Sequence, residues 1–151
     1  MPKMRKLGHV VLFVRDPVAS GEWYRDILGM DVVVQGGQFP AVFLSVKDRD
    51  HDLALFESPQ GRKLGYQDLE HISFEIEGGL DEWKRFNQLL AEKGVEVVAC
   101  VDHGISYGVY FLDPDGHHVE VFCQRHADDA LSKKEFARIG AIAVPVNPAE
   151  A

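Results

Sequence analysis

The sequence contains few of the features that mark secreted, membrane or nucleic-acid-binding proteins. It has only two cysteines, Cys100 and Cys123, and no CxxC pair, so we expect free thiols, a reducing compartment and a cytoplasmic location. No apolar run approaches the roughly 20 residues of a membrane-spanning helix, and the first residues do not form a signal-peptide pattern. A formal net charge of −8 disfavours nucleic acids and anionic membranes as partners, so a small molecule is the expected ligand.

The sequence also lacks several catalytic signatures. It has no glycine-rich phosphate loop and no serine nucleophile elbow. With 151 residues, of which 46% are hydrophobic and 26% charged, the chain has the size and composition of one globular domain.

What the sequence does contain is one pattern written twice. Each copy opens with a strand, GHVVLFVRD from Gly8 and EHISFEIEG from Glu70. An amphipathic helix, a hydrophobic strand and a pair of strands follow in both copies. We predict an α+β fold in which two βαβββ repeats, about 6–58 and 69–124, join their sheets into an open barrel with the helices outside. Residues 1–125 would form this single domain.

Local signals agree with the repeat. Asp16 and Pro17 are typical of the start of a helix. The apolar stripe predicted for the first helix is Val18, Trp23, Ile27 and Leu28, and that of the second is Leu80, Trp83, Phe86 and Leu90. The DPDG sequence at 113–116 predicts the turn of a hairpin in the second copy.

Residues 126–151 are predicted to form a C-terminal extension with a short helix. Ser132 is the predicted N-cap of this helix, and Glu135 is its capping-box partner. The apolar residues of the helix are Leu131, Phe136 and Ile139. They would cover the barrel edge or a second subunit, which leaves a homodimer as an open alternative.

Three residues of the repeats could converge on one metal ion. His9 and His71 occupy matched positions in the two opening strands, and Glu120 lies in the last strand of the second copy. Strand alternation places His71 and Glu120 with the polar residues that face away from the helices. Two imidazoles and one carboxylate leave open positions on a metal for a chelating substrate and a further ligand. We therefore predict one divalent metal per subunit, and Fe(II), Mn(II), Zn(II) and Ni(II) all accept such ligands.

The duplicated unit, together with GHVVLFVRD, EHISFEIE and YFLDPDGHHVEVF, resembles the vicinal oxygen chelate superfamily over about residues 6–125. This superfamily includes extradiol dioxygenases, glyoxalase I, fosfomycin-resistance thiol transferases, methylmalonyl-CoA epimerases and metal-free bleomycin-binding proteins, so one fold hosts several chemistries. Members similar to glyoxalase I carry a second metal carboxylate where this chain has Ala54, and the nearby Glu57 lies on the opposite strand face. The resemblance therefore implies a three-ligand site and disfavours glyoxalase chemistry.

Further residues resemble those of the extradiol dioxygenases. In that family a histidine before the strand leading to the second metal histidine is a distal acid/base, and here His51 holds this position. A tyrosine ten residues before the metal glutamate hydrogen-bonds the substrate, and here this is Tyr110. His103 lies in a segment that resembles the one preceding that tyrosine, so it would contact substrate. Strand alternation gives His51 the opposite parity to Ala54, so it reaches the metal face only if the backbone turns before the strand.

The resemblance implies a metal-dependent enzyme, with cleavage of a catecholic substrate by O2 as the leading reaction and Fe(II) as the favoured metal. His51, Tyr110 and His103 would be its catalytic residues. Two alternatives stay open. One is a glyoxalase-like or fosfomycin-resistance-like lyase or transferase, and the other is a non-catalytic protein that binds a drug or metabolite.

Overall fold

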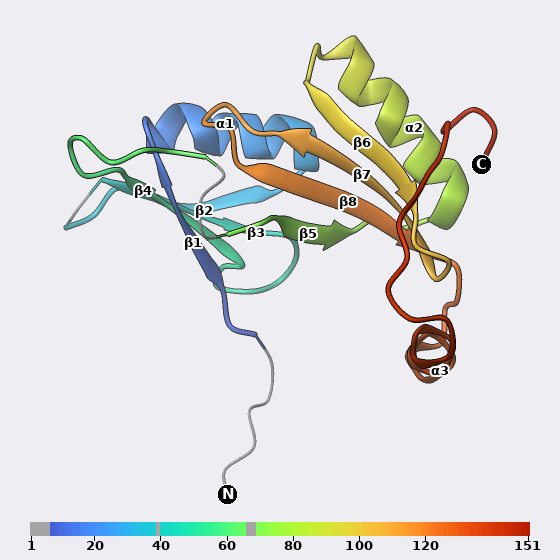
Figure 1. Cartoon of the computed structure of the whole chain (residues 1–151). Coiled ribbons are helices and arrows are strands. Elements are labelled where there is room, and N and C mark those ends of the chain that lie inside the picture. Colours follow the sequence, from blue (N-terminus) through green and yellow to red (C-terminus); the bar gives the residue numbers. More distant parts are fainter. Residues whose placement is uncertain (1–6, 39, 66–68) are drawn as a thin grey trace, which may run out of the picture. The chain divides into compact units, whose positions relative to one another are not determined.

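A computed structural model describes residues 7–38, 40–65 and 69–151 of the chain (Figure 1). The chain divides after residue 65 into two compact units. None of the helices in the described residues combines the length and hydropathy of a transmembrane span.

Each unit contains one βαβββ repeat. The first unit consists of β1 (Val10–Val14), α1 (Pro17–Leu28), β2 (Asp31–Gln35), β3 (Ala41–Ser45) and β4 (Leu53–Glu57). The second consists of β5 (Ile72–Glu75), α2 (Gly79–Glu92), β6 (Val97–Asp102), β7 (Ser106–Leu112) and β8 (His118–Gln124), followed by α3 (Asp129–Ile139) and β9 (Val144–Pro145).

The first unit is a four-stranded sheet with the order β1-β4-β3-β2. Strands β1 and β4 are parallel, and the other neighbours are antiparallel. Helix α1 packs mainly on β3 and β4. The buried apolar residues of this unit are Leu12, Val14, Tyr24, Ile27, Met30, Ala41, Val42, Leu44, Leu53, Ala54 and Leu55.

Local sequence explains both ends of α1. The carboxylate of Asp16 accepts hydrogen bonds from the backbone N–H groups of Val18 and Ala19, at 3.0 and 3.1 Å. Pro17 follows at the first helical position, where its missing N–H costs nothing. Gly29 ends the helix in the left-handed region with φ 64°. The predicted start of this helix is confirmed.

The predicted apolar stripe of α1 is wrong in part. The buried residues of α1 are Pro17, Ser20, Gly21, Tyr24 and Ile27, whereas Val18 is 42% exposed and Trp23 and Leu28 are only half-buried. The cause is a close approach to the sheet, because a Cβ at Gly21 would meet Cγ1 of Val42 at 2.8 Å. Small residues therefore face the sheet, and Tyr24 rather than Trp23 fills the space beside them.

The second unit repeats this topology with the order β5-β8-β7-β6, and β9 adds a fifth strand beside β6. Strands β5 and β8 are parallel, as β1 and β4 are. Helix α2 packs on β8 and β7 and buries Trp83, Phe86 and Leu90 of its predicted stripe, while Leu80 is half-buried. Trp83 also donates its indole N–H to the carbonyl of Val121 at 3.2 Å, which ties α2 to β8.

The hairpin between β7 and β8 is confirmed, and a buried pair closes its turn. One carboxylate oxygen of Asp113 accepts from the backbone N–H groups of Asp115 and His117, at 2.9 and 2.8 Å. The other lies 2.8 Å from Nδ1 of His117. Both side chains are buried, so this contact fixes the register that places the residues of β8.

The C-terminal residues continue the second unit. Helix α3 begins after Asp128, whose carboxylate accepts from the N–H groups of Ala130 and Leu131, at 2.7 and 3.0 Å. The predicted N-cap Ser132 lies inside the helix instead, and its hydroxyl donates to Gln124 at 3.2 Å. Asp128 caps the helix because it stands one turn earlier and its carboxylate reaches both free N–H groups.

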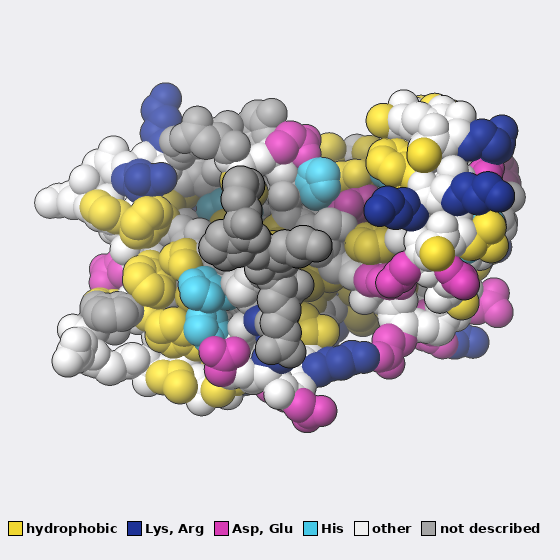
Figure 2. Space-filling view, turned by 90° about the horizontal axis from the view of Figure 1, so that it is seen from below, with side chains coloured by type: hydrophobic (Ala, Val, Ile, Leu, Met, Phe, Trp, Pro, Cys, Tyr) yellow, Lys and Arg dark blue, Asp and Glu magenta, His cyan; other side chains and the backbone are white. Residues whose placement is uncertain are grey.

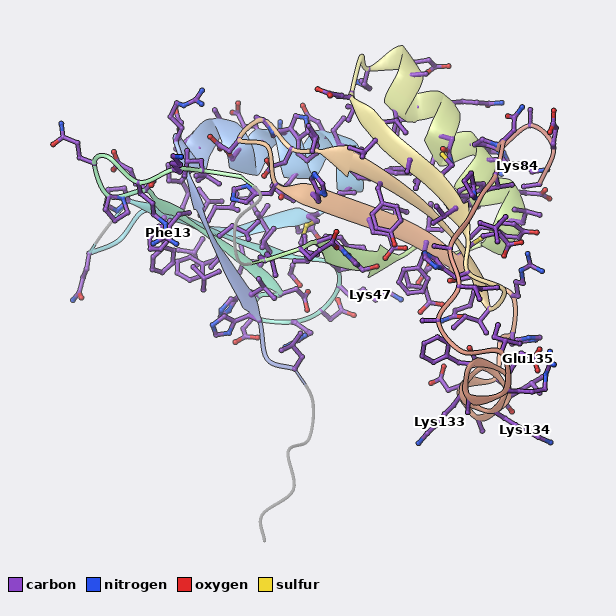
Figure 3. The ribbon with its side chains drawn as sticks, in the orientation of Figure 1. Phe13, Lys47, Lys84, Lys133, Lys134 and Glu135 are labelled. Carbon is purple, nitrogen blue, oxygen red and sulfur yellow. The ribbon has the colours of Figure 1, made fainter. Side chains whose placement is uncertain are left out.

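Helix α3 has a solvent-exposed surface. Lys133 and Lys134 project outward from it (Figure 3). Its apolar residues Leu131 and Phe136 are 50% and 47% exposed, and Figure 2 shows hydrophobic side chains interspersed with charged ones on the surface viewed from below. The predicted short helix is therefore present, and two of its three apolar residues are largely uncovered in the single chain.

The α+β class and the two βαβββ repeats are confirmed. Within the described ranges, no strand of one sheet is hydrogen-bonded to a strand of the other, so each repeat forms its own sheet. The joining of the two sheets into an open barrel stays a prediction.

Candidate metal and substrate site

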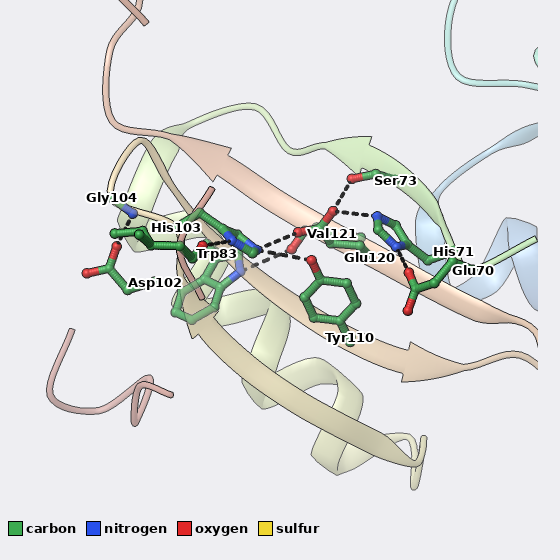
Figure 4. Close-up of polar contacts among 11 residues, drawn as sticks. Glu70, His71, Ser73, Trp83, Asp102, His103, Gly104, Tyr110, Glu120 and Val121 are labelled. Atoms are coloured by element: carbon green, nitrogen blue, oxygen red, sulfur yellow. Dashed lines mark hydrogen bonds and ion pairs between the residues drawn. The ribbon is translucent and has the colours of Figure 1, made fainter. Parts of the chain in front are cut away.

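Three neighbouring strands of the second unit bring polar side chains to one face of their sheet. Ser73 on β5 is in register with Glu120 on β8, and Glu120 is in register with Tyr110 on β7. Residues in register on neighbouring strands point to the same side of a sheet. Figure 4 shows these side chains together with His71 and His103. This group of five residues is the Glu120 cluster.

Glu120 is the centre of the cluster. Its side chain is only 8% exposed, and the hydroxyl of Ser73 donates to Oε2 at 2.5 Å. Nε2 of His71 lies 3.4 Å from the same oxygen, and Nε2 of His103 lies 3.5 Å from Oε1. A buried carboxylate needs a hydrogen-bond donor because it has left water, and Ser73 supplies one. The imidazole nitrogens of His71 and His103 thus approach the two oxygens of one carboxylate.

Gly108 leaves room for this carboxylate. It stands two residues before Tyr110 on β7, and a Cβ built on it would meet Oε1 of Glu120 at 2.3 Å. Real Cβ atoms do not approach another atom this closely, so the carboxylate of Glu120 occupies space that is free only because residue 108 is a glycine. The absence of a side chain at Gly108 leaves this space open to the carboxylate.

Glu70 holds the ring of His71 from the outside. Its carboxylate hydrogen-bonds Nδ1 of His71. Because a carboxylate only accepts, Nδ1 carries the proton, and Nε2 of the neutral ring has a free lone pair on the side of Glu120. A carboxylate behind a histidine in this way is the usual arrangement around metal-binding imidazoles.

His103 and Tyr110 form a second polar pair. Nε2 of His103 lies 3.0 Å from the hydroxyl of Tyr110, while Nδ1 of His103 lies 2.7 Å from the backbone carbonyl of Ile142. The carbonyl can only accept, so Nδ1 donates to it. Nε2 of the neutral ring is then an acceptor for the Tyr110 hydroxyl.

The hydroxyl of Tyr110 is held in its protonated form. Burial raises the pKa of Tyr110, and the negative charge of the nearby Glu120 raises it further. The ring of Tyr110 also stands edge-on to that of His71, with centroids 5.2 Å apart. The phenol is therefore a rigid hydrogen-bond donor next to the carboxylate.

The first unit holds the other predicted site residues. The rings of His9 and His51 lie with centroids 4.4 Å apart, and the ring of His51 stands edge-on to Phe43 at 5.2 Å. Phe43 is in register with Ala54. His51 precedes β4, and its contact with Phe43 places it on the same face as Ala54. In a continuous strand, residues 51 and 54 would point to opposite faces, so the backbone turns between His51 and β4.

The two units can be compared position by position. Val11, Ala54 and Phe43 are in register in the first sheet, as Ser73, Glu120 and Tyr110 are in the second. The position that matches Glu120 is therefore Ala54 in the first sheet. The ring of His51 packs between those of His9 and Phe43.

The structure brings the predicted residues together in two groups. His71, Glu120, Tyr110 and His103 contact one another in the second unit, and His9 contacts His51 in the first. Over the ranges that the structure describes, no set of three or more His, Cys, Asp or Glu side chains is already arranged to hold a metal ion.

The donor set nevertheless fits a divalent metal. His71 presents an unprotonated Nε2 and Glu120 presents buried oxygens, and these are ligands that Fe(II), Mn(II), Zn(II) and Ni(II) accept. Gly108 keeps the space for the carboxylate free. His71 and Glu120 thus supply one nitrogen and one oxygen ligand from neighbouring strands.

Sequence analysis did not identify three residues that shape the cluster. Ser73 could have been found, since it shares the strand face of His71. Glu70 could have been found as the neighbour of a candidate ligand, although its contact depends on side-chain rotamers. Nothing in the sequence identifies Gly108 as a site residue, because its role depends on the rotamer of the Glu120 side chain.

Comparison with known proteins identifies relatives of the chain. The profile of the Glyoxalase/Bleomycin resistance protein/Dioxygenase superfamily matches residues 6–121. Biphenyl-2,3-diol 1,2-dioxygenase 3 of Rhodococcus globerulus is 35% identical over 121 residues, which are 77% of this chain and 62% of the relative. Metallothiol transferase FosB of Staphylococcus epidermidis is 27% identical over 127 residues, which are 78% of this chain and 83% of the relative.

Solved structures share the fold. The fosfomycin resistance protein FosX of Listeria monocytogenes, complexed with Mn(II) and sulfate, superposes with a TM-score of 0.67 at 19% identity, covering 87% of this chain and 99% of that chain. The chain spans 62% of the dioxygenase but 83% of the transferase.

Proposed function

Because the chain belongs to the Glyoxalase/Bleomycin resistance protein/Dioxygenase superfamily, as its sequence resemblance predicted, we propose that it is a metal-dependent enzyme that cleaves a catecholic ring with O2. Residues 1–125 would be the catalytic domain and 126–151 an extension of it. The proposed metal ligands are His9, His71 and Glu120.

One observation carries this proposal. A buried carboxylate, Glu120, lies among two histidine Nε2 atoms and a phenol, on one face of three adjacent strands. Such a cluster can bind a metal through His71 and Glu120 while Tyr110 and His103 remain free for a substrate with hydroxyl groups. The 35% identity to a dioxygenase that acts on a biphenyl diol supports a catecholic substrate.

A bound Fe(II) ion would supply open coordination positions for the two adjacent catechol oxygens and for dioxygen. Glu70 keeps the proton of His71 on Nδ1, so that Nε2 is available as a ligand. Ser73 and Gly108 hold and accommodate the carboxylate of Glu120. The residues around the site therefore orient the ligands before any substrate arrives.

Tyr110 and His103 would handle a proton of the substrate. The Tyr110 hydroxyl donates to Nε2 of His103 and can accept a hydrogen bond from a substrate hydroxyl. A proton leaving the substrate would then reach Nε2 through the phenol, and the raised pKa of Tyr110 keeps the phenol from remaining ionised. His51, beside His9 in the first unit, would be the distal acid/base.

A second candidate function is transfer of a thiol to a small substrate. It is supported by the 27% identity to metallothiol transferase FosB over 78% of this chain. The same three metal ligands would serve this reaction, but an oxyanion substrate needs cations near the metal. The Glu120 cluster is built instead from histidine, serine and tyrosine side chains, which is why we prefer the dioxygenase.

Parallel assays distinguish the two reactions. Protein purified without oxygen and loaded with Fe(II) is mixed with catechol, 3-methylcatechol or 2,3-dihydroxybiphenyl, and oxygen uptake and the yellow ring-opened product are followed. Protein loaded with Mn(II) is mixed with fosfomycin and a low-molecular-weight thiol, and loss of the thiol is followed. Glu120→Gln is the matched control for both. Turnover of the thiol but of no catechol would overturn the dioxygenase proposal.

A further inference from the structure

The segment after α3 lies on the turn that carries His103. Strand β9 pairs with the end of β6, with Val144 in register with Asp102. The N–H of Val146 donates to the carbonyl of Cys100 at 3.0 Å. The chain therefore returns from α3 to the edge of the sheet next to the Glu120 cluster.

The turn itself is shaped for this contact. Gly104 follows His103 with φ 78°, and a Cβ on it would meet Cδ1 of Ile139 at 2.5 Å and Cδ1 of Ile142 at 3.0 Å. Asp102 fixes the turn from the other side, since its carboxylate accepts from the N–H of Gly104 at 2.7 Å. A bare backbone at Gly104 thus allows two isoleucines to pack directly over the turn.

The same segment also reaches the histidine ring. The backbone carbonyl of Ile142 accepts from Nδ1 of His103 at 2.7 Å. Which ring nitrogen of a neutral histidine carries the proton is decided by such a contact. Nε2 is then left unprotonated, 3.0 Å from the Tyr110 hydroxyl and on the side of Glu120.

We propose that residues 139–146, the positioning segment, hold His103 in its Nδ1–H tautomer and so keep Nε2 as the acceptor for the Tyr110 hydroxyl. The role of this acceptor in turnover rests on the proposed function, whereas the tautomer does not. Through the backbone carbonyl of Ile142, the C-terminal extension would therefore position a residue of the Glu120 cluster. A backbone contact of this kind cannot be predicted from the pattern of side chains.

The chain offers a matched pair of variants. Removal of residues 141–151 takes away the Ile142 carbonyl and β9. Lys84→Met removes only the hydrogen bond from Nζ of Lys84 to the carbonyl of Ala151, 2.6 Å long, at the far end of the extension (Figure 3). If the truncated chain does not fold, the full-length variant Ile139→Ser/Ile142→Ser loosens the packing over Gly104 instead. Ile142→Val is its conservative counterpart.

The tautomer is measured directly in 15N-labelled protein without added metal, from long-range proton–nitrogen correlations of the His103 ring, which His103→Gln assigns. We expect one Nδ1–H signature in the wild type, Lys84→Met and Ile142→Val. We expect its loss, or a mixture of tautomers, in the truncated chain and in Ile139→Ser/Ile142→Ser. Retention of the pure Nδ1–H tautomer in a folded loosened variant would overturn the proposal.

Kinetics separate this proposal from the proposed function. If the enzyme turns over a catechol, the loosened variants should lose kcat by about 10-fold or more with little change in KM, because the acceptor acts on a bound substrate. If the wild type turns over no catechol, the dioxygenase proposal fails, and the tautomer comparison still decides whether the segment positions His103.

Discussion

Oε1 of Glu120 occupies the space that a side chain at Gly108 would take, since a Cβ there would lie 2.3 Å away. The two residues are on neighbouring strands, with Gly108 in register with Phe122 and Tyr110 in register with Glu120. The carboxylate therefore leans along β7 toward the side of His103. This lean, and not the strand register alone, brings both histidines within reach of one carboxylate.

Gly108→Ala should displace the carboxylate and weaken metal binding. Changes in groups that orient metal ligands typically reduce metal affinity by about 10–100-fold, and we expect a loss in this range. Isothermal titration with Fe(II) or Mn(II) under anaerobic conditions measures it. Val98→Ala, at a 50% exposed position of β6, is the control and should bind as the wild type does. Unchanged affinity in Gly108→Ala would show that metal binding does not depend on the space at Gly108.

His71→Ala should abolish stoichiometric metal binding and leave a folded protein. The side chain of His71 is 31% exposed, and its sheet is formed by apolar packing that does not need a metal. Metal content after dialysis, together with circular dichroism, measures both effects. His126→Ala lies outside the cluster and should retain about one metal per subunit. Equal metal in His71→Ala and the wild type would refute the ligand assignment.

The sequence predicted one helix face better than the other, for a physical reason. Trp83, Phe86 and Leu90 are large apolar residues at helical spacing, so hydrophobicity alone identifies the buried side of α2. In α1 the close approach at Gly21 determines the buried side. A pattern of apolar residues does not register a glycine, and so it predicts Trp23 rather than Tyr24 as the buried aromatic residue of α1.

The site was predictable to the extent that it depends on strand alternation. Alternation places Ser73, Tyr110 and Glu120 on one face, and the registers agree. The contact of Ile142 with His103 was not predictable, because it joins a backbone carbonyl to a ring 39 residues away. The position of His51 on the face of Ala54 was not predictable either, since it depends on the turn that precedes β4.

Both cysteines should react slowly with alkylating reagents in the folded protein. Burial raises the pKa of the Cys100 and Cys123 thiols, so less of the reactive thiolate is present near neutral pH. Cys123 is 1% exposed and should be the slower of the two. Iodoacetamide labelling followed by mass spectrometry, with and without urea, measures the rates, and Cys100→Ser isolates Cys123. Native labelling as fast as in urea would contradict the burial of these strands.

His51→Phe should separate a catalytic role from a structural one. The side chain of His51 is 19% exposed and packs against the rings of His9 and Phe43. A phenylalanine preserves this aromatic packing, so the free energy of unfolding should change by less than about 1 kcal/mol. The metal content should also stay near that of the wild type.

Turnover of a ring-cleavable catechol should nevertheless fall in His51→Phe, by roughly 10²–10⁴-fold, because proton transfer by a placed side chain is typically worth this much. Phe43→Leu is the matched control. It alters the packing around His51 but removes no proton-transfer group, so it should lose far less activity. Full activity in His51→Phe would exclude His51 as the distal acid/base. The proton shuttle would then have to be sought at His103, whose Nε2 already contacts the Tyr110 hydroxyl.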